Sequence, residues 1–279
     1  MQAPTTHVPT QVRLRLAHGV LEHHARSAGV ELLHVKGVAL HPQLAEGRRR
    51  STDCDVLVRP AQVPVFTAAL AAEGWEQITT FAHGSVFMHA ATFHHTVWGT
   101  VDVHRSFPGL DRDPGASFAQ LWDGHEEMLL GGVPCAVPAL RPQRLLLLVH
   151  AARDATGHAR HDLDVSWTRV DASEQERIDA LARDLGALVP LAIATGRPEL
   201  ARGGPGEHLW TALHANADAR GVRAARWRDA HGLRERLRLL VEAARVNPDH
   251  LALRLGHRPD RAELRREWWA RLRRALPRR

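Results

Sequence analysis

Apolar residues follow two different periods in the first hundred positions of the chain. A stripe of period 3.6 predicts a helix, whereas short apolar or alternating runs between glycines predict strands. Thr10 is a residue type that caps helix N-termini, and Pro60 is suited to open a helix. Helices are predicted over 11–28, 38–45 and 61–72, and strands over 31–35, 55–58, 75–81, 85–89 and 93–104. This order predicts an α+β fold, with a mixed β-sheet and flanking helices.

From about residue 138 onward, the pattern is helical and remains so to the end of the chain. Gly203 to Gly206, with the sequence Gly-Gly-Pro-Gly, is the clearest flexible joint in this half. Helices are predicted over 143–154, 161–167, 174–186, 187–195, 207–216, 220–229, 233–246 and 261–276. We therefore expect two domains, an α+β domain over residues 1–137 and an α-helical domain over residues 138–279.

The composition is that of an ordinary globular protein, with 44% hydrophobic and 24% charged residues. No apolar run approaches 18 residues, and the polar N-terminus has no signal-peptide pattern, so we expect a cytoplasmic protein without a membrane partner. Only Cys54 and Cys135 occur, and neither has a partner at zinc-ligand spacing. The sequence supports neither a disulfide framework nor a cysteine-based metal site.

Paired acids are the strongest chemical signal. Asp53 and Asp55 stand two residues apart at the head of a predicted strand, so their side chains share one face. Like charges held this close repel each other, and such a pair commonly binds a cation such as Mg²⁺. A third acid, Asp102, lies in another predicted strand, and His104 shares its face. We expect Asp53, Asp55 and Asp102 to bind metal and to be catalytic, with His104 beside the substrate.

The basic residues include 36 arginines and a single lysine, Lys36, which immediately precedes Gly37. A bias toward arginine explains the 36 but does not explain the one lysine that remains. A lysine acts on phosphate as a movable point charge, and a glycine before a helix lets backbone N–H groups approach an anion. Chance retention of the lysine and a solvated loop for the arginine run 48–50 are the alternative interpretations.

Taken together, these motifs resemble the polymerase-β-type nucleotidyltransferase superfamily. More narrowly, they resemble a poorly characterised bacterial group in which Lys-Gly replaces the usual Gly-Ser of the first motif. The resemblance covers roughly residues 30–105. It matches Lys36 and Gly37 to the first motif, Asp53 and Asp55 to the metal pair, Asp102 to the third carboxylate and His104 to its companion.

The resemblance implies a Mg²⁺-dependent enzyme, with Mn²⁺ as the alternative metal. It would transfer NMP from an NTP to a hydroxyl or phosphate of a small molecule or peptide in specialised metabolism, with release of pyrophosphate. Arg50 and Ser51 would bind the nucleotide together with the Lys-Gly turn. Helices after the catalytic domain would close over the nucleotide, which would place His150 and Asp164 at the substrate cleft. The alternative is that His150 is an ordinary buried histidine and Asp164 an acid on a helix surface.

Two alternatives stay open at this stage. Residues 220–279 hold 18 arginines and seven acids, a local charge of +11, which suggests an anionic partner. A toxin-like enzyme that modifies tRNA would use these arginines to bind RNA, although they also fit a merely solvated helical surface. The second alternative is a non-catalytic nucleotide-binding protein.

Overall fold

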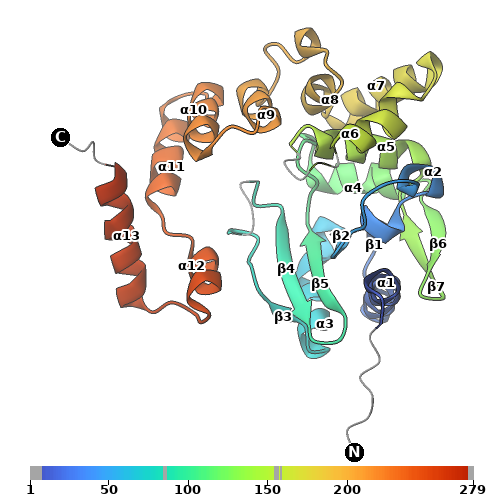
Figure 1. The fold of residues 1–279 in the computed structure, drawn as a ribbon, viewed down its shortest axis with the longest axis horizontal. Helices are drawn as coiled ribbons and strands as arrows, with labels where there is room; N and C mark the ends of the chain where they lie inside the picture. The colour runs from blue at the N-terminus through green and yellow to red at the C-terminus, as the bar shows by residue number, and fades with distance from the viewer. Residues whose placement is uncertain (1–7, 84–86, 154–156, 158, 276–279) are drawn as a thin grey trace, which may run out of the picture.

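A computed structural model describes residues 8–83, 87–153, 157 and 159–275. Its centre is one mixed sheet with the strand order β1-β2-β5-β4-β3 (Figure 1). β2 and β5 run parallel, and the other neighbouring strands run antiparallel. The strands are β1 (Leu32–Val35), β2 (Cys54–Val58), β3 (Glu76–Gln77), β4 (Ala90–His95) and β5 (Gly99–His104). The predicted α+β fold with a mixed sheet is confirmed.

The two faces of this sheet differ in chemistry. One face is apolar and packs against α1 (Thr10–Ser27) and α3 (Val63–Ala72), with Val56, Val101 and Val103 among the strand residues in this core. Side chains alternate along a strand, so Asp55, Asp102 and other intervening residues lie on the opposite face. The alternation therefore separates a packed face from a polar one.

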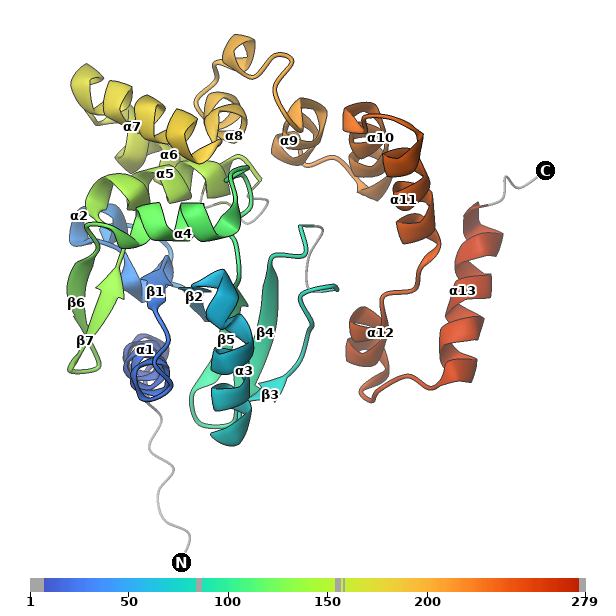
Figure 2. The same cartoon turned by 180° about the vertical axis from the view of Figure 1, so that it is seen from behind.

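Helices that follow the five strands in the chain cover part of the polar side of the sheet (Figure 2). Leu33, Val35 and Leu57 reach from the sheet into a core that also contains Leu145 and many other helical residues. The helices here are α4 (Pro114–Trp122), α5 (Leu140–Ala151), α6 (Ala159–Leu163), α7 (Ala172–Leu185) and α8 (Leu188–Ala194). A continuous core thus joins residues from both sides of position 137, while the proposed domain division itself stays a prediction.

A two-stranded hairpin, β6 (Glu126–Leu130) and β7 (Val133–Val137), lies beside β1 and α1. The sequence patterns predicted neither this hairpin nor α4. In β7, Cys135 is fully buried in the apolar core. The hairpin therefore brings a later part of the chain against the first helix and the first strand.

The last helices form an arm beside the sheet, drawn in orange and red in Figures 1 and 2. The helices are α9 (Glu207–His214), α10 (Ala219–Asp229), α11 (Leu233–Ala244), α12 (Pro248–Leu255) and α13 (Arg261–Ala275). Residues at the start of α12 connect this arm to the segment after β3. Asp249 accepts hydrogen bonds of 2.8 Å from the Thr80 backbone N–H and hydroxyl, and Asn247 donates to the His83 carbonyl. The pattern missed α12.

Several element boundaries differ from the predictions. The expected helix over 38–45 is a 3₁₀ turn, Gly37–Ala39, followed by a short α2, Pro42–Ala45. Pro42 is the reason, because the residue before a proline is pushed out of helical conformation. Pro9 rather than Thr10 precedes α1 as its cap, and 93–104 is a hairpin of β4 and β5.

The predicted strand over 85–89 falls partly on residues 84–86, which lie outside the described residues. No helix in the described part of the chain combines the length and the apolarity needed to cross a membrane.

Candidate active site

Two carboxylates and an imidazole converge on the polar face of the sheet. Asp55 of β2 and Asp102 of β5 are direct partners in the parallel strand register. His104 stands two residues further along β5, so it shares the face of Asp102. Ligating atoms of these three side chains all lie within 4.8 Å of one another. The predicted association of Asp55, Asp102 and His104 is thus present in the fold.

Asp55 is held by two nitrogen donors. Lys36 Nζ and His104 Nε2 each lie 2.7 Å from Asp55 Oδ1, and all three side chains are largely buried. Burial by itself would raise the pKa of Asp55, but the Lys36 ammonium and the His104 hydrogen bond outweigh it and lower the pKa. Asp55 is therefore an ionised carboxylate at neutral pH.

Asp102 has the opposite electrostatic environment. Burial raises its pKa, and the negative charge of Asp55 raises it further. The Thr92 hydroxyl on β4 donates a hydrogen bond of 2.7 Å to Asp102 Oδ1 and orients the carboxyl group. A carboxylate with a raised pKa accepts a proton more readily than an ordinary aspartate.

The Lys-Gly turn at the end of β1 has an unusual backbone. Lys36 has φ 57° and ψ −170°, a combination that glycine adopts and other residues rarely do. Gly37 has φ 52°, and a Cβ at this position would lie 3.1 Å from Ser51 Oγ. Gly37 therefore packs closely against Ser51, and the turn holds the Lys36 ammonium beside Asp55.

The strain at Lys36 can be measured by comparing Lys36→Gly with Lys36→Ala. Both variants lose the ammonium, but only the alanine keeps a Cβ in the unfavourable conformation. We expect the glycine variant to be the more stable of the two, by about 1 kcal/mol in urea unfolding, although glycine usually costs stability relative to alanine. An alanine variant that is equally or more stable would show that the turn is not strained.

The arginine run divides into one buried and two exposed side chains. Arg48 forms a two-pronged ion pair with Asp162 of α6, with Nε and Nη2 2.7 and 2.9 Å from the two carboxylate oxygens. Arg49 and Arg50 are exposed and line the cavity in front of the carboxylates. The solvated-loop interpretation is thus wrong for Arg48, which attaches the loop to the helical half.

Asp53 lies apart from the group formed by Asp55, Asp102 and His104. Its carboxylate accepts a hydrogen bond of 3.0 Å from Ser51 Oγ, which also donates to the Asp53 carbonyl. Asp53 and Asp55 nevertheless line the same cavity. The i and i+2 spacing therefore put both carboxylates on one side, but the loop before β2 gives Asp53 different partners.

The cavity in front of these side chains has a volume of about 630 Å³. His150 and Arg153, from α5 and the residues after it, contribute to its wall, as do His89 and Thr92. His89 lies beside His104 with ring centroids 5.1 Å apart and the ring planes tilted by 37°, and burial lowers the pKa of His89 to about 2. Its imidazole is therefore neutral, and Lys36 and the arginines supply positive charge at the cavity.

Most, but not all, of the predicted site residues meet at this cavity. Lys36, Gly37, Arg50, Ser51, Asp53, Asp55, Asp102, His104 and His150 line it. Asp164 does not, because it pairs with Arg169 at 2.5 Å on the surface of the helical half. Sequence reasoning missed Thr92, His89, Arg153 and Asp162. Only Thr92 left a local signal, since it alternates with apolar residues along its strand.

A family model described as an uncharacterised nucleotidyltransferase matches residues 12–200, which include all of these cavity residues. No curated protein matches the chain. The comparisons give no support to the expectation of an RNA partner.

Two solved structures show distant similarity. One is the antibiotic-resistance factor ANT(2'')-Ia, with a TM-score of 0.44 and 14% identity over 63% of this chain and 94% of that chain. The other is the lincosamide antibiotic adenylyltransferase LnuA in its lincomycin-bound form, with a TM-score of 0.36 and 15% identity over 52% of this chain and 91% of that chain. Neither likeness is close enough to carry a substrate over to this chain.

Proposed function

Because the chain belongs to the uncharacterised nucleotidyltransferase family, we propose that it transfers NMP from an NTP to a hydroxyl or phosphate of a small molecule or peptide. Membership of this family confirms the class of enzyme expected from the motifs. One observation carries the finer proposal: Asp55, Asp102 and His104 meet at a cavity whose rim holds the Lys36-Gly37 turn. A cavity of this size matches those that hold small-molecule substrates.

The donor set fits a divalent cation that prefers oxygen ligands. Asp55 Oδ1 accepts both nitrogen donors, whereas Oδ2 has no hydrogen-bond partner among the described residues. We propose that Asp55 and Asp102 hold Mg²⁺, with Mn²⁺ as the alternative. Asp53, which lies beside Ser51 in the same cavity wall, is proposed as a further ligand. When bound, such an ion would neutralise triphosphate charge and polarise the reacting oxygens.

Asp102 is the proposed proton acceptor. Its carboxylate lies beside Asp55 at the cavity, where it would take the proton of the acceptor hydroxyl as the oxygen forms its bond to the α-phosphorus. The bond between the α-phosphorus and the bridging oxygen breaks, and pyrophosphate leaves with that oxygen. When the acceptor is an ionised phosphate, no proton has to be removed. Thr92 keeps the Asp102 carboxyl oriented in both cases.

Cationic and backbone groups on the cavity wall suit a triphosphate. Arg49 and Arg50 are exposed at the rim, and Lys36 lies on the wall beside Asp55. Positive groups of this kind compensate charge that moves onto the leaving pyrophosphate, which is the main requirement of phosphoryl-type transfer. Gly37 and Ser51 line the same part of the cavity, where a backbone N–H and a hydroxyl could contact the phosphates.

The experiment that tests this proposal is a screen of the four ribonucleoside triphosphates with and without Mg²⁺. Thermal stabilisation reports binding, and pyrophosphate release in the presence of pooled hydroxyl and phosphate acceptors reports turnover. We expect at least one triphosphate to stabilise the wild type in a metal-dependent way, and Asp55→Asn to lose that response. An exposed acid outside the cavity supplies the matched control, Asp123→Asn, which should respond like the wild type.

The same screen separates the two remaining alternatives. Stabilisation by a triphosphate without pyrophosphate release from any acceptor would favour a nucleotide-binding role. Release only with tRNA present, weakened steeply by salt, would favour the RNA-modifying alternative. If no triphosphate binds, the carboxylates serve another purpose and the proposed reaction is wrong.

A further inference from the structure

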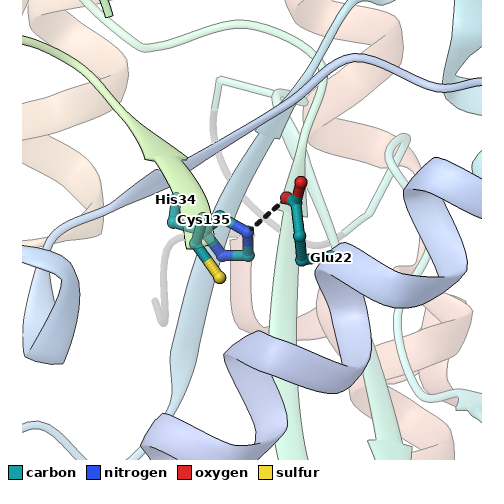
Figure 3. Close-up of side chains that lie close together, drawn as sticks. All are labelled: Glu22, His34 and Cys135. Atoms are coloured by element: carbon teal, nitrogen blue, oxygen red, sulfur yellow. Dashed lines mark hydrogen bonds and ion pairs between the residues drawn. The ribbon is translucent and has the colours of Figure 1, made fainter. Parts of the chain in front are cut away.

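A second group of ligating side chains lies on the opposite side of the sheet from the active-site carboxylates. Glu22 of α1, His34 of β1 and Cys135 of β7 point toward one another, and one ligating atom from each lies within 4.8 Å of the others (Figure 3). Glu22 is 6% exposed, and His34 and Cys135 are fully buried.

Within this group, His34 Nε2 lies 3.0 Å from Glu22 Oε2. The remaining polar atoms have partners of the kind expected around a bound metal, since His34 Nδ1 lies 2.7 Å from Nδ1 of the fully buried His18. Arg26 Nε donates to the other Glu22 oxygen at 2.6 Å. Metal-binding imidazoles and carboxylates are usually oriented by such contacts to their remaining polar atoms.

The charges of the group also suit a soft divalent cation. Burial lowers the pKa of both His18 and His34, so the imidazoles are neutral and keep a nitrogen lone pair. Burial opposes ionisation of Glu22, but His34 and Arg26 outweigh it and lower its pKa. One carboxylate and one thiolate balance the two positive charges of Zn²⁺, so a loaded site carries no net charge in the core.

We propose that Glu22, His34 and Cys135 bind Zn²⁺ as a structural site that ties α1, β1 and β7 together. Carboxylate, imidazole and thiolate are all established zinc ligands, and a water would complete four-fold coordination. Burial raises the pKa of the Cys135 thiol to about 12, so Zn²⁺ must displace the thiol proton to solvent. A metal on His34 Nε2 would replace the proton that this atom directs at Glu22, so His34 would carry its one proton on Nδ1 and donate it to His18 Nδ1, with the His18 proton on Nε2.

The location gives this site a consequence for the active site. His34 lies two residues before Lys36, whose strained turn holds an ammonium against Asp55. A metal bond to His34 would fix the end of β1 against α1 and β7. The spacing of cysteines could not reveal this site, because its three ligands come from distant positions and only one is a cysteine.

Cobalt substitution tests the proposal without any measurement of activity. The protein is stripped with a chelator, excess Mg²⁺ is added to occupy the active-site carboxylates, and Co²⁺ is titrated while the absorption spectrum is recorded. We expect a thiolate-to-cobalt charge-transfer band that saturates at one equivalent and is removed by Zn²⁺. Co²⁺ bound at Asp55, Asp102 and His104 would lack this band, because that group contains no cysteine.

The two buried cysteines provide a matched pair of variants. Cys54 is also fully buried, but its Sγ lies 3.7 Å from the Leu14 carbonyl oxygen and outside the ligand group. We expect Cys54→Ala to keep the charge-transfer band and Cys135→Ala to lose it, with circular dichroism checking that both fold. Absence of the band in the wild type, or its persistence in Cys135→Ala, would overturn the proposal. The wild-type titration decides even if Cys135→Ala does not fold.

Discussion

Asp102→Asn is expected to lower turnover by at least about 10²-fold while leaving the protein as stable as the wild type or more so. Activity falls because asparagine can neither accept the proton nor supply a charged metal ligand. Stability does not fall because the substitution removes a buried negative charge that the charge of Asp55 repels. Burial and this repulsion are what raise the pKa of Asp102. Asparagine also keeps the oxygen that accepts the Thr92 hydrogen bond.

The stability effect has a definite dependence on pH. A raised pKa in the folded state means that stability is lost as pH rises from the ordinary carboxyl pKa to the raised one. The wild type and Asp102→Asn should therefore unfold at similar temperatures at low pH and diverge as pH rises toward neutral. Thermal unfolding across this range in a chelator measures the difference.

Asp55→Asn is the informative comparison for Asp102→Asn. It should also lose turnover, but it should be less stable than the wild type, because Lys36 loses its partly buried counter-charge. Equal losses of stability in the two variants would contradict the electrostatic difference between the two carboxylates. Near-normal pyrophosphate release in either would contradict the proposed metal site.

Asp162→Asn is expected to cost about 3–5 kcal/mol of unfolding free energy, because it leaves a buried guanidinium without its counter-charge. The Arg48 side chain is 8% exposed and that of Asp162 is 0% exposed. Arg48 also begins the loop that carries Arg49, Arg50 and Ser51 at the cavity. Turnover should therefore fall even at temperatures where the variant is folded.

A neighbouring ion pair supplies the control for this prediction. Asp164, two residues after Asp162, pairs with Arg169, but the side chains of this pair are 35% and 71% exposed. We therefore expect Asp164→Asn to lower the free energy of unfolding by less than about 1 kcal/mol. The double variant Arg48→Met with Asp162→Leu should recover most of the stability lost in Asp162→Asn. Urea unfolding of the wild type, the two single variants and the double variant measures these differences in unfolding free energy. Similar losses of unfolding free energy in Asp162→Asn and Asp164→Asn would contradict the prediction.

The sequence by itself predicted much of the polar face that carries the candidate active site. Alternation along 53–58 and around Asp102 showed which side chains share a face, and the strands did bring Asp55, Asp102 and His104 together. The type of fold followed from the same local signals, whereas the family was identified from the resemblance of its motifs to a known superfamily. These inferences succeeded because side-chain alternation is a property of the strand backbone itself and needs no tertiary contact.

Other features depended on which distant segments pack together. The register of β2 with β5 placed Asp55 opposite Asp102 and β4 placed Thr92 beside it, whereas the loop before β2 gave Asp53 a different partner. The ion pair of Arg48 and Asp162 spans 114 positions, so no local pattern could indicate it.

The buried group of Glu22, His34 and Cys135 also depended partly on local sequence and partly on tertiary packing. The sequence predicted the helix and the strand that carry Glu22 and His34, but not the strand that carries Cys135, and it showed no cysteine pair at zinc-ligand spacing. Only the tertiary structure decided that α1, β1 and β7 would meet at these side chains. The physical reason is that periodicity is local, whereas the choice of neighbours depends on the packing of the whole core.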